Sequence, residues 1–187
     1  MTSPDTRQQI VRFARQLIQT RSYLGFSFQD IADKVGIRKP SLYHHFASKQ
    51  ALGVEVLRQA YAAFERWAAR TPATPQGKLS AYFDMYRHWL NPGHGMCPAG
   101  AMAPGWDCIE ADLKQAVRAL REVQIAWLCE VIAALHPKRR GSREQLASYI
   151  FSTAQGALVS ARMSGRPEDF DAVAEIAQRT LLAPPDC

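Results

Sequence analysis

Apolar residues recur every three or four positions along most of the chain, which is the spacing of one face of an α-helix. Near the amino terminus the pattern predicts one amphipathic helix over residues 4–20, with its apolar face formed by Ile10, Phe13, Ala14, Leu17 and Ile18. No segment shows a convincing alternation of apolar and polar residues, the pattern that would favour a strand. The chain is therefore expected to be all-α.

Two short helices are predicted next, over about residues 28–35 and 40–46. Ser27 and Asp30 are three residues apart at the start of the first helix, which is the spacing of a capping box. Gly36 allows a tight turn after that helix, and Pro40 can open the second. Two helices joined by a short glycine turn have the layout of a helix-turn-helix.

Longer helices are predicted in the rest of the chain. The first of them covers about residues 49–70 and ends at the Thr-Pro-Ala-Thr-Pro stretch of residues 71–75. A stretch rich in proline and glycine, near residues 91–105, forms a second interruption. The remaining helices are expected over about residues 76–90, 107–135, 142–164 and 167–182.

Composition restricts the class of protein. A chain of 187 residues with 47% hydrophobic and 21% charged residues is typical of one or two globular domains. No apolar run approaches the roughly 20 residues of a membrane-spanning helix, so no membrane partner is expected. The cysteines form no CxxC pair, which favours reduced thiols and a cytoplasmic location; they are Cys97, Cys108, Cys129 and Cys187.

Positive charge is concentrated in the first 50 residues. They contain eight Lys and Arg against three Asp, so they carry +5 of the chain's net charge of +6. This distribution is typical of a surface that binds a polyanion, although a solvated basic surface would have the same composition. In the predicted helix-turn-helix the polar and basic side chains lie on the front, away from the core, and they are Arg38, Lys39, Ser41, Tyr43, His44 and His45. DNA binding is the favoured interpretation, and a helical hairpin without a DNA role is the alternative.

The run from Ser27 to Leu52, SFQDIADKVGIRKPSLYHHFASKQAL, resembles the signature of the TetR/AcrR family of regulators, and the likeness covers about residues 6–57. The resemblance implies an all-helical homodimer with about nine helices per subunit. It also implies an operator-binding domain over residues 1–50 and a domain over residues 51–187 that binds a small ligand and dimerises. Most members of the family are repressors that the ligand releases from DNA.

The resemblance also assigns roles to individual residues. Contacts with backbone phosphates, which position a protein without reading sequence, are expected from Ser27, Tyr43, His45 and Lys49. Base readout is expected from residues on or next to the recognition helix, namely Arg38, Lys39, Ser41 and His44.

The central part of the chain is rich in aromatic residues and methionines. Such residues between helices could line a pocket for a small apolar or aromatic effector, although ordinary core packing is the alternative. The candidate ligand-binding residues are Tyr82, Tyr86, Trp89, Met96, Cys97, Met102, Trp106 and Trp127.

Cys97 raises a second hypothesis. If Pro98 starts a short helix, Cys97 lies near its amino terminus, where the helix dipole favours a thiolate. The segment resembles the Gly-Cys start of family members that sense electrophiles or oxidants, so a thiol-based regulator is an alternative to ligand release. A buried, inert packing cysteine is the other interpretation.

Metal binding and catalysis are disfavoured. The spacing of His88, His94, Cys97 and Cys108 matches no compact zinc pattern, so no metal or other cofactor is expected. No catalytic motif is present, and the chain is not expected to be an enzyme. A helical small-molecule binder or enzyme with an incidental helix-turn-helix is the alternative from a different class.

The last two predicted helices carry apolar faces that suggest a dimer interface. Two copies would form a four-helix bundle across a two-fold axis, which would place the recognition helices about 34–36 Å apart and predict a palindromic operator. Packing within one subunit is the alternative. The candidate interface residues are Phe151, Ala154, Leu158, Ala161, Phe170, Val173 and Ala177.

Overall fold

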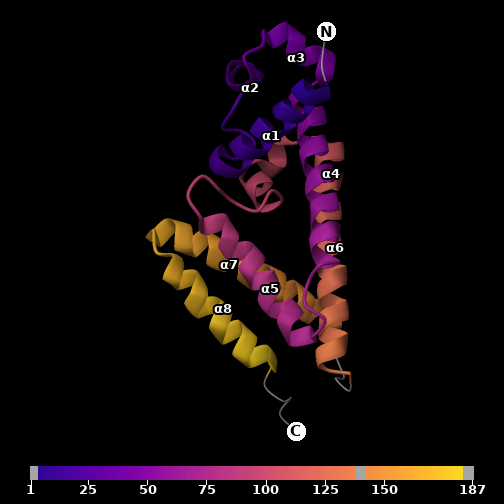
Figure 1. Ribbon diagram of the computed structural model, residues 1–187, viewed down its shortest axis with the longest axis vertical. Coiled ribbons are helices and arrows are strands. Elements are labelled where there is room, and N and C mark those ends of the chain that lie inside the picture. The colour runs from indigo at the N-terminus through magenta and orange to yellow at the C-terminus, as the bar shows by residue number, and fades with distance from the viewer. Residues whose placement is uncertain (1–3, 138–141, 183–187) are drawn as a thin grey trace. The chain divides into compact units, whose positions relative to one another are not determined.

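The computed structural model describes residues 4–137 and 142–182, and Cys187 lies outside these ranges. This part of the chain contains helices and no strand (Figure 1), which confirms the all-α fold. Its α-helices are α1 (Pro4–Arg21), α2 (Phe28–Val35), α3 (Lys39–His45), α4 (Lys49–Ala68), α5 (Pro75–Arg87), α6 (Ala111–Leu135), α7 (Arg143–Ser164) and α8 (Pro167–Leu182). Two 3-10 helices, η1 (His88–Leu90) and η2 (Gly100–Cys108), bring the number close to the nine helices expected.

The helix boundaries follow local signals with small differences. Thr74 caps α5, because its hydroxyl accepts a hydrogen bond from the Gly77 amide at 3.2 Å. The helix expected to run to residue 90 tightens into η1 after Arg87. The stretch expected to be irregular contains η2, in which Pro104 and the non-helical backbone of Gly105 prevent a regular α-helix.

The described part divides into two compact units. The first comprises residues 4–63 and 93–121, and the second comprises residues 64–92, 122–137 and 142–182. These units do not follow the predicted functional boundary at residue 50, which stays a prediction.

In the first unit, the segment before η2 is attached to the end of α1. The Met96 amide donates to the Gln19 carbonyl oxygen at 2.9 Å, and the Gln19 side chain donates back to the Met96 carbonyl oxygen at 3.0 Å. A Cβ atom at Gly95 would lie 2.2 Å from that Gln19 oxygen, so only glycine allows this approach. The segment therefore packs as part of the same unit as the helix-turn-helix.

Glu55 connects α1 with α4 in the first unit. Its carboxylate accepts hydrogen bonds from Arg58 at 2.8 Å, from Gln59 at 2.9 Å and from Arg7 of α1 at 3.4 Å. The bond from Arg58 is the main reason that the pKa of Glu55 falls to about 2, against the opposing effect of burial. The charged carboxylate is therefore stabilised where the two helices meet.

In the second unit, α7 and α8 form an antiparallel hairpin that turns at Gly165, whose φ of 71° is left-handed (Figure 1). Five of the seven predicted dimer-interface residues are buried inside this unit, and they are Ala154, Leu158, Ala161, Phe170 and Ala177. These five side chains form internal core, because α7 and α8 use this face to pack within one subunit. That placement corrects the prediction for them, whereas Phe151 is half-buried and Val173 is 37% exposed.

None of the described helices is both long enough and apolar enough to cross a membrane.

Candidate functional site

The helix-turn-helix is formed by α2, a turn at Gly36 and α3. Ser27 caps α2 through a capping box with Asp30, in which the Ser27 amide donates to the Asp30 carboxylate at 2.7 Å. Hydrogen bonds from the Ser27 side chain and backbone lower the pKa of Asp30. Gly36 has a left-handed φ of 76°, and the amides of Gly36 and Ile37 both donate to the Ala32 carbonyl oxygen. These contacts are local, which is why the sequence predicted them.

One side of the motif is anchored in the core. Phe28, Ile31, Leu42 and Phe46 are all at most 6% exposed. The Arg7 guanidinium of α1 lies 4.7 Å from the centroid of the Phe46 ring, a distance at which a cation is attracted to the ring face. This packing leaves the opposite side of α3 free to meet another molecule.

The opposite side carries the predicted DNA-binding residues. Arg38, Lys39, Tyr43 and His44 are exposed, as is Ser27, whereas Ser41, His45 and Lys49 are half-buried.

Four of these residues converge on one hollow of about 390 Å³, and they are Ser27, Lys39, Tyr43 and Lys49. The rest of its lining is Phe26, Phe28, Ala47 and Ser48, so the hollow contains hydroxyls and two amino groups but no carboxylate. It also adjoins the amino terminus of α2, where backbone N–H groups favour an anion. The amino groups and the Tyr43 hydroxyl are donors that suit a phosphate, whereas the Ser27 hydroxyl already donates to the Asp30 carboxylate at 2.6 Å. Arg38, Ser41, His44 and His45 are not part of the lining.

Four lining residues were not predicted as part of the site, and they are Phe26, Phe28, Ala47 and Ser48. The Phe28 ring packs against Tyr43 with centroids 5.1 Å apart, and Ser48 caps α4 by accepting from the Ala51 amide at 3.0 Å. The place of Ser48 beside Ser27 depends on tertiary packing and could not be predicted from the sequence.

The predicted ligand-binding residues divide between the two units. Tyr82, Tyr86, Trp89 and Trp127 lie in the second unit, and Met96, Cys97, Met102 and Trp106 lie in the first.

In the second unit, aromatic rings surround a buried glutamine. The hydroxyls of Tyr82 and Tyr86 each donate to Gln124 Oε1 at 3.1 Å. The Trp127 ring stacks on Tyr82 at 5.9 Å and lies 5.3 Å from Trp67. Tyr82 and Tyr86 are fully buried, so the cluster is a set of packed aromatic rings around a polar centre at Gln124. Trp89 is half-buried in η1.

In the first unit, Cys97 is 5% exposed and Met102 is fully buried. The Cys97 carbonyl oxygen accepts from the Ala101 amide at 2.9 Å, so Cys97 does precede a short helical segment. Burial keeps a reagent away from the sulfur, so the structure offers no support for the thiol-sensor hypothesis. Trp106 is half-buried, with Lys114 and Arg118 near its ring. No group of three or more potential metal ligands occurs within residues 4–137 and 142–182.

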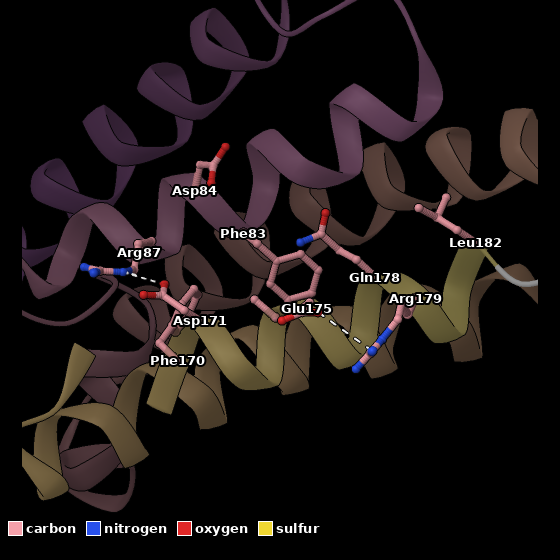
Figure 2. Close-up of a pocket in the computed structure, with 10 residues that line it drawn as sticks. Phe83, Asp84, Arg87, Phe170, Asp171, Glu175, Gln178, Arg179 and Leu182 are labelled. Carbon is pink, nitrogen blue, oxygen red and sulfur yellow. Dashed lines mark hydrogen bonds and ion pairs between the residues drawn. The ribbon is translucent and has the colours of Figure 1, made fainter. Parts of the chain in front are cut away.

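A groove that the sequence did not predict lies between α5 and α8 in the second unit (Figure 2). It has a volume of about 480 Å³, with the buried rings of Phe83 and Phe170 among its lining. The Arg87 guanidinium donates to the Asp171 carboxylate at 2.6 Å across the two helices, as the dashed line in Figure 2 shows. No motif marks this groove, because its lining comes from two helices far apart in the sequence.

Comparison with known proteins points to one family. Residues 10–56 match the sequence model described as "Bacterial regulatory proteins, tetR family". The chain is 25% identical to the HTH-type transcriptional repressor DhaR of Mycobacterium sp. (strain GP1), over 97% of this chain and 95% of that protein. It is 34% identical over 65 residues to the repressor NemR of Escherichia coli (strain K12), which is 35% of this chain and 33% of NemR.

A solved structure shows the same likeness over nearly the whole chain. A transcriptional regulator of the TetR family from Agrobacterium tumefaciens superposes with a TM-score of 0.88 at 26% identity, covering 96% of this chain and 98% of that one.

Proposed function

Because this chain belongs to the TetR family of transcriptional regulators, we propose that it is a ligand-responsive repressor that binds a palindromic operator as a homodimer. A small apolar or aromatic effector releases it from that operator. Its place of action is the cytoplasm, where the DNA is.

The observation that carries the proposal is the hollow beside α3. Ser27 caps α2, whereas Lys39 and Tyr43 lie one turn apart on α3, and the three meet around one space of phosphate-binding character. Arg38 and His44 are exposed outside the hollow, where they remain available for base edges. Phosphate anchors beside free base readers are what a sequence-specific DNA contact requires.

The proposed dimer interface is the outer face of α7 and α8. Tyr149, Val159 and Met163 are 48%, 40% and 83% exposed, and their spacing places them on one face of α7 with Gly156. A Cβ atom at Gly156 would meet nothing within 4 Å, so a partner helix could approach closely there. Val173 and Ile176 of α8 are also exposed apolar residues. This face would replace the buried residues that the sequence suggested.

The proposed effector site includes the cluster around Tyr82, Tyr86 and Trp127. Tyr82 and Tyr86 are fully buried and their hydroxyls donate to Gln124, so a bound effector would stack on a ring of the cluster and replace one of these hydrogen bonds. Coupling between effector and operator then requires a difference in affinity of typically 1–3 kcal/mol between two states of the dimer.

Selection of bound fragments from a random DNA pool tests this function. The expected product is a palindrome that the protein retards in a gel with excess random competitor DNA. A library of apolar and aromatic compounds is then screened for release of that fragment. If the selected pool shows no preferred sequence, the protein is not an operator-specific regulator.

A further inference from the structure

Lys49, the first residue of α4, contacts the loop that joins α1 and α2. Its ammonium donates to the Phe26 carbonyl oxygen, and lies 4.2 Å from the centroid of the Phe26 ring and 4.7 Å from that of Tyr23. The two rings are themselves buried, and meet edge to face at 6.3 Å. A cation over two aromatic faces is held by their negative potential. The side chain therefore has a defined place inside the protein.

The loop that Lys49 contacts has an irregular backbone. Ser22 has a left-handed φ of 61°, and a Cβ atom at Gly25 would lie 2.0 Å from the Arg21 carbonyl oxygen. The carbonyl group that Lys49 holds belongs to Phe26, directly before the cap residue Ser27. The contact therefore fixes the chain at the point where α2 begins.

Lys39 lines the same hollow as Lys49, so the exposure of the two lysines can be compared directly. Lys39 is exposed, whereas Lys49 is half-buried, and burial lowers the pKa of Lys49 against the opposing charge of Asp30. An exposed ammonium whose side chain can rotate contacts a DNA phosphate most readily. Lys39 fits that description, and Lys49 is already engaged with the loop.

We propose that Lys49 is a positioning residue of the DNA-binding site: its ammonium holds the α1–α2 loop, and so sets Ser27 and the amino terminus of α2 against the DNA, instead of contacting a phosphate. The inference rests on the proposed DNA-binding function. It differs from the role that the family resemblance assigns to this lysine.

The salt dependence of DNA binding separates the two roles. Each lysine–phosphate contact contributes roughly 0.9 to the slope of log K against log salt concentration, so a dimer that loses two contacts loses roughly 1.8. The variant Lys49→Met is expected to bind the operator roughly tenfold more weakly with the slope of the wild type. Lys39→Met, the matched control, is expected to lower the slope. A fall of roughly 1.8 in Lys49→Met, or unchanged affinity, would overturn the proposal.

Hydrogen exchange of the free protein provides a readout that needs no operator. Lys49→Met is expected to speed exchange of the amides of residues 28–31, while Lys39→Met leaves them unchanged. Unchanged exchange in Lys49→Met contradicts the positioning role. If the wild type has no operator at all, the proposed function fails, but this comparison still decides the role of Lys49.

Two further variants distinguish an effect of Lys49 on the loop from a general loss of stability. Phe26→Leu removes one ring while Lys49 keeps its charge, and it is expected to weaken DNA binding at an unchanged slope. Glu55→Gln loosens the contact of α1 with α4 away from the loop, and is expected to keep its affinity at temperatures where it is folded. Wild-type affinity in Phe26→Leu, or equal weakening in Glu55→Gln, would show that Lys49 does not act through the loop.

Discussion

Tyr43 of α3 packs on Phe28, the first residue of α2, with ring centroids 5.1 Å apart and planes inclined at 59°. Phe28 is 6% exposed, whereas Tyr43 is 51% exposed. The buried ring therefore orients a tyrosine that remains half in solvent at the edge of the proposed phosphate site. A ring held in this way loses little conformational freedom when its hydroxyl meets DNA.

Tyr43→Phe should weaken operator binding without loss of stability. The variant keeps the ring on Phe28 and removes only the hydroxyl, so each subunit loses one hydrogen bond of about 0.5–1.5 kcal/mol. The dimer therefore loses about 1–3 kcal/mol, or roughly 5- to 160-fold in Kd. Fluorescence anisotropy with a labelled operator measures this loss, and thermal unfolding provides the control. The loss should be the same for all DNA sequences, because a phosphate contact carries no sequence information. A changed base preference would assign Tyr43 to base readout.

Arg38→Ala should change which sequence is preferred. Arg38 is exposed at the start of α3, and its side chain makes no capping hydrogen bond. An arginine on a guanine edge contributes roughly 1–3 kcal/mol of discrimination. Repeating the selection with the variant should relax the consensus at one position in each half-site. An unchanged consensus with uniformly lower affinity would instead make Arg38 a phosphate contact.

Glu55→Gln should lower stability at neutral pH. The folded protein holds the pKa of Glu55 at about 2, below its ordinary value of 4.5, so the charged form stabilises the fold above pH 4.5. That contribution is lost as the pH falls from 4.5 toward 2. Loss of the charged hydrogen bonds should cost about 1–3 kcal/mol at pH 7.

Urea unfolding of both proteins between pH 7 and pH 3 measures this effect. The difference between wild type and Glu55→Gln should shrink below pH 4.5, because the wild-type carboxyl begins to take up a proton on unfolding. A difference that stays constant across this range would mean that the contacts of Glu55 do not depend on its charge.

Val159→Glu should dissociate the dimer. The residue is 40% exposed on the outer face of α7, so a carboxylate there is tolerated in a single subunit but costs free energy in an apolar interface. Sedimentation velocity should show a shift to monomer and gel retardation a large loss of operator affinity. Gln178→Glu is the matched control, because Gln178 lines the groove between α5 and α8. If Val159→Glu remains dimeric while Gln178→Glu dissociates, the interface lies on the groove side.

The place of the helix-turn-helix and the family it represents could be predicted from the sequence. The capping box of Ser27 with Asp30, the left-handed turn at Gly36 and the proline in the first turn of α3 involve residues at most five apart, so their geometry follows from local chemistry. The exposure of Arg38, Lys39, Tyr43 and His44 follows from the same local pattern, because it depends only on which side of α3 is apolar.

Two other features depended on contacts between distant segments. On α7, Leu158 and Val159 are neighbours of similar character, and the packing of other helices against α7, among them α8 and α5, decides that the first is fully buried and the second is exposed. In the sequence, Lys49 is simply a basic residue at the start of a helix. In the structure, its ammonium donates a hydrogen bond to the carbonyl oxygen of Phe26, 23 residues earlier. Helical spacing in the sequence shows which residues share a face of a helix. Which of these faces is buried depends on the helices that pack against it in the tertiary structure.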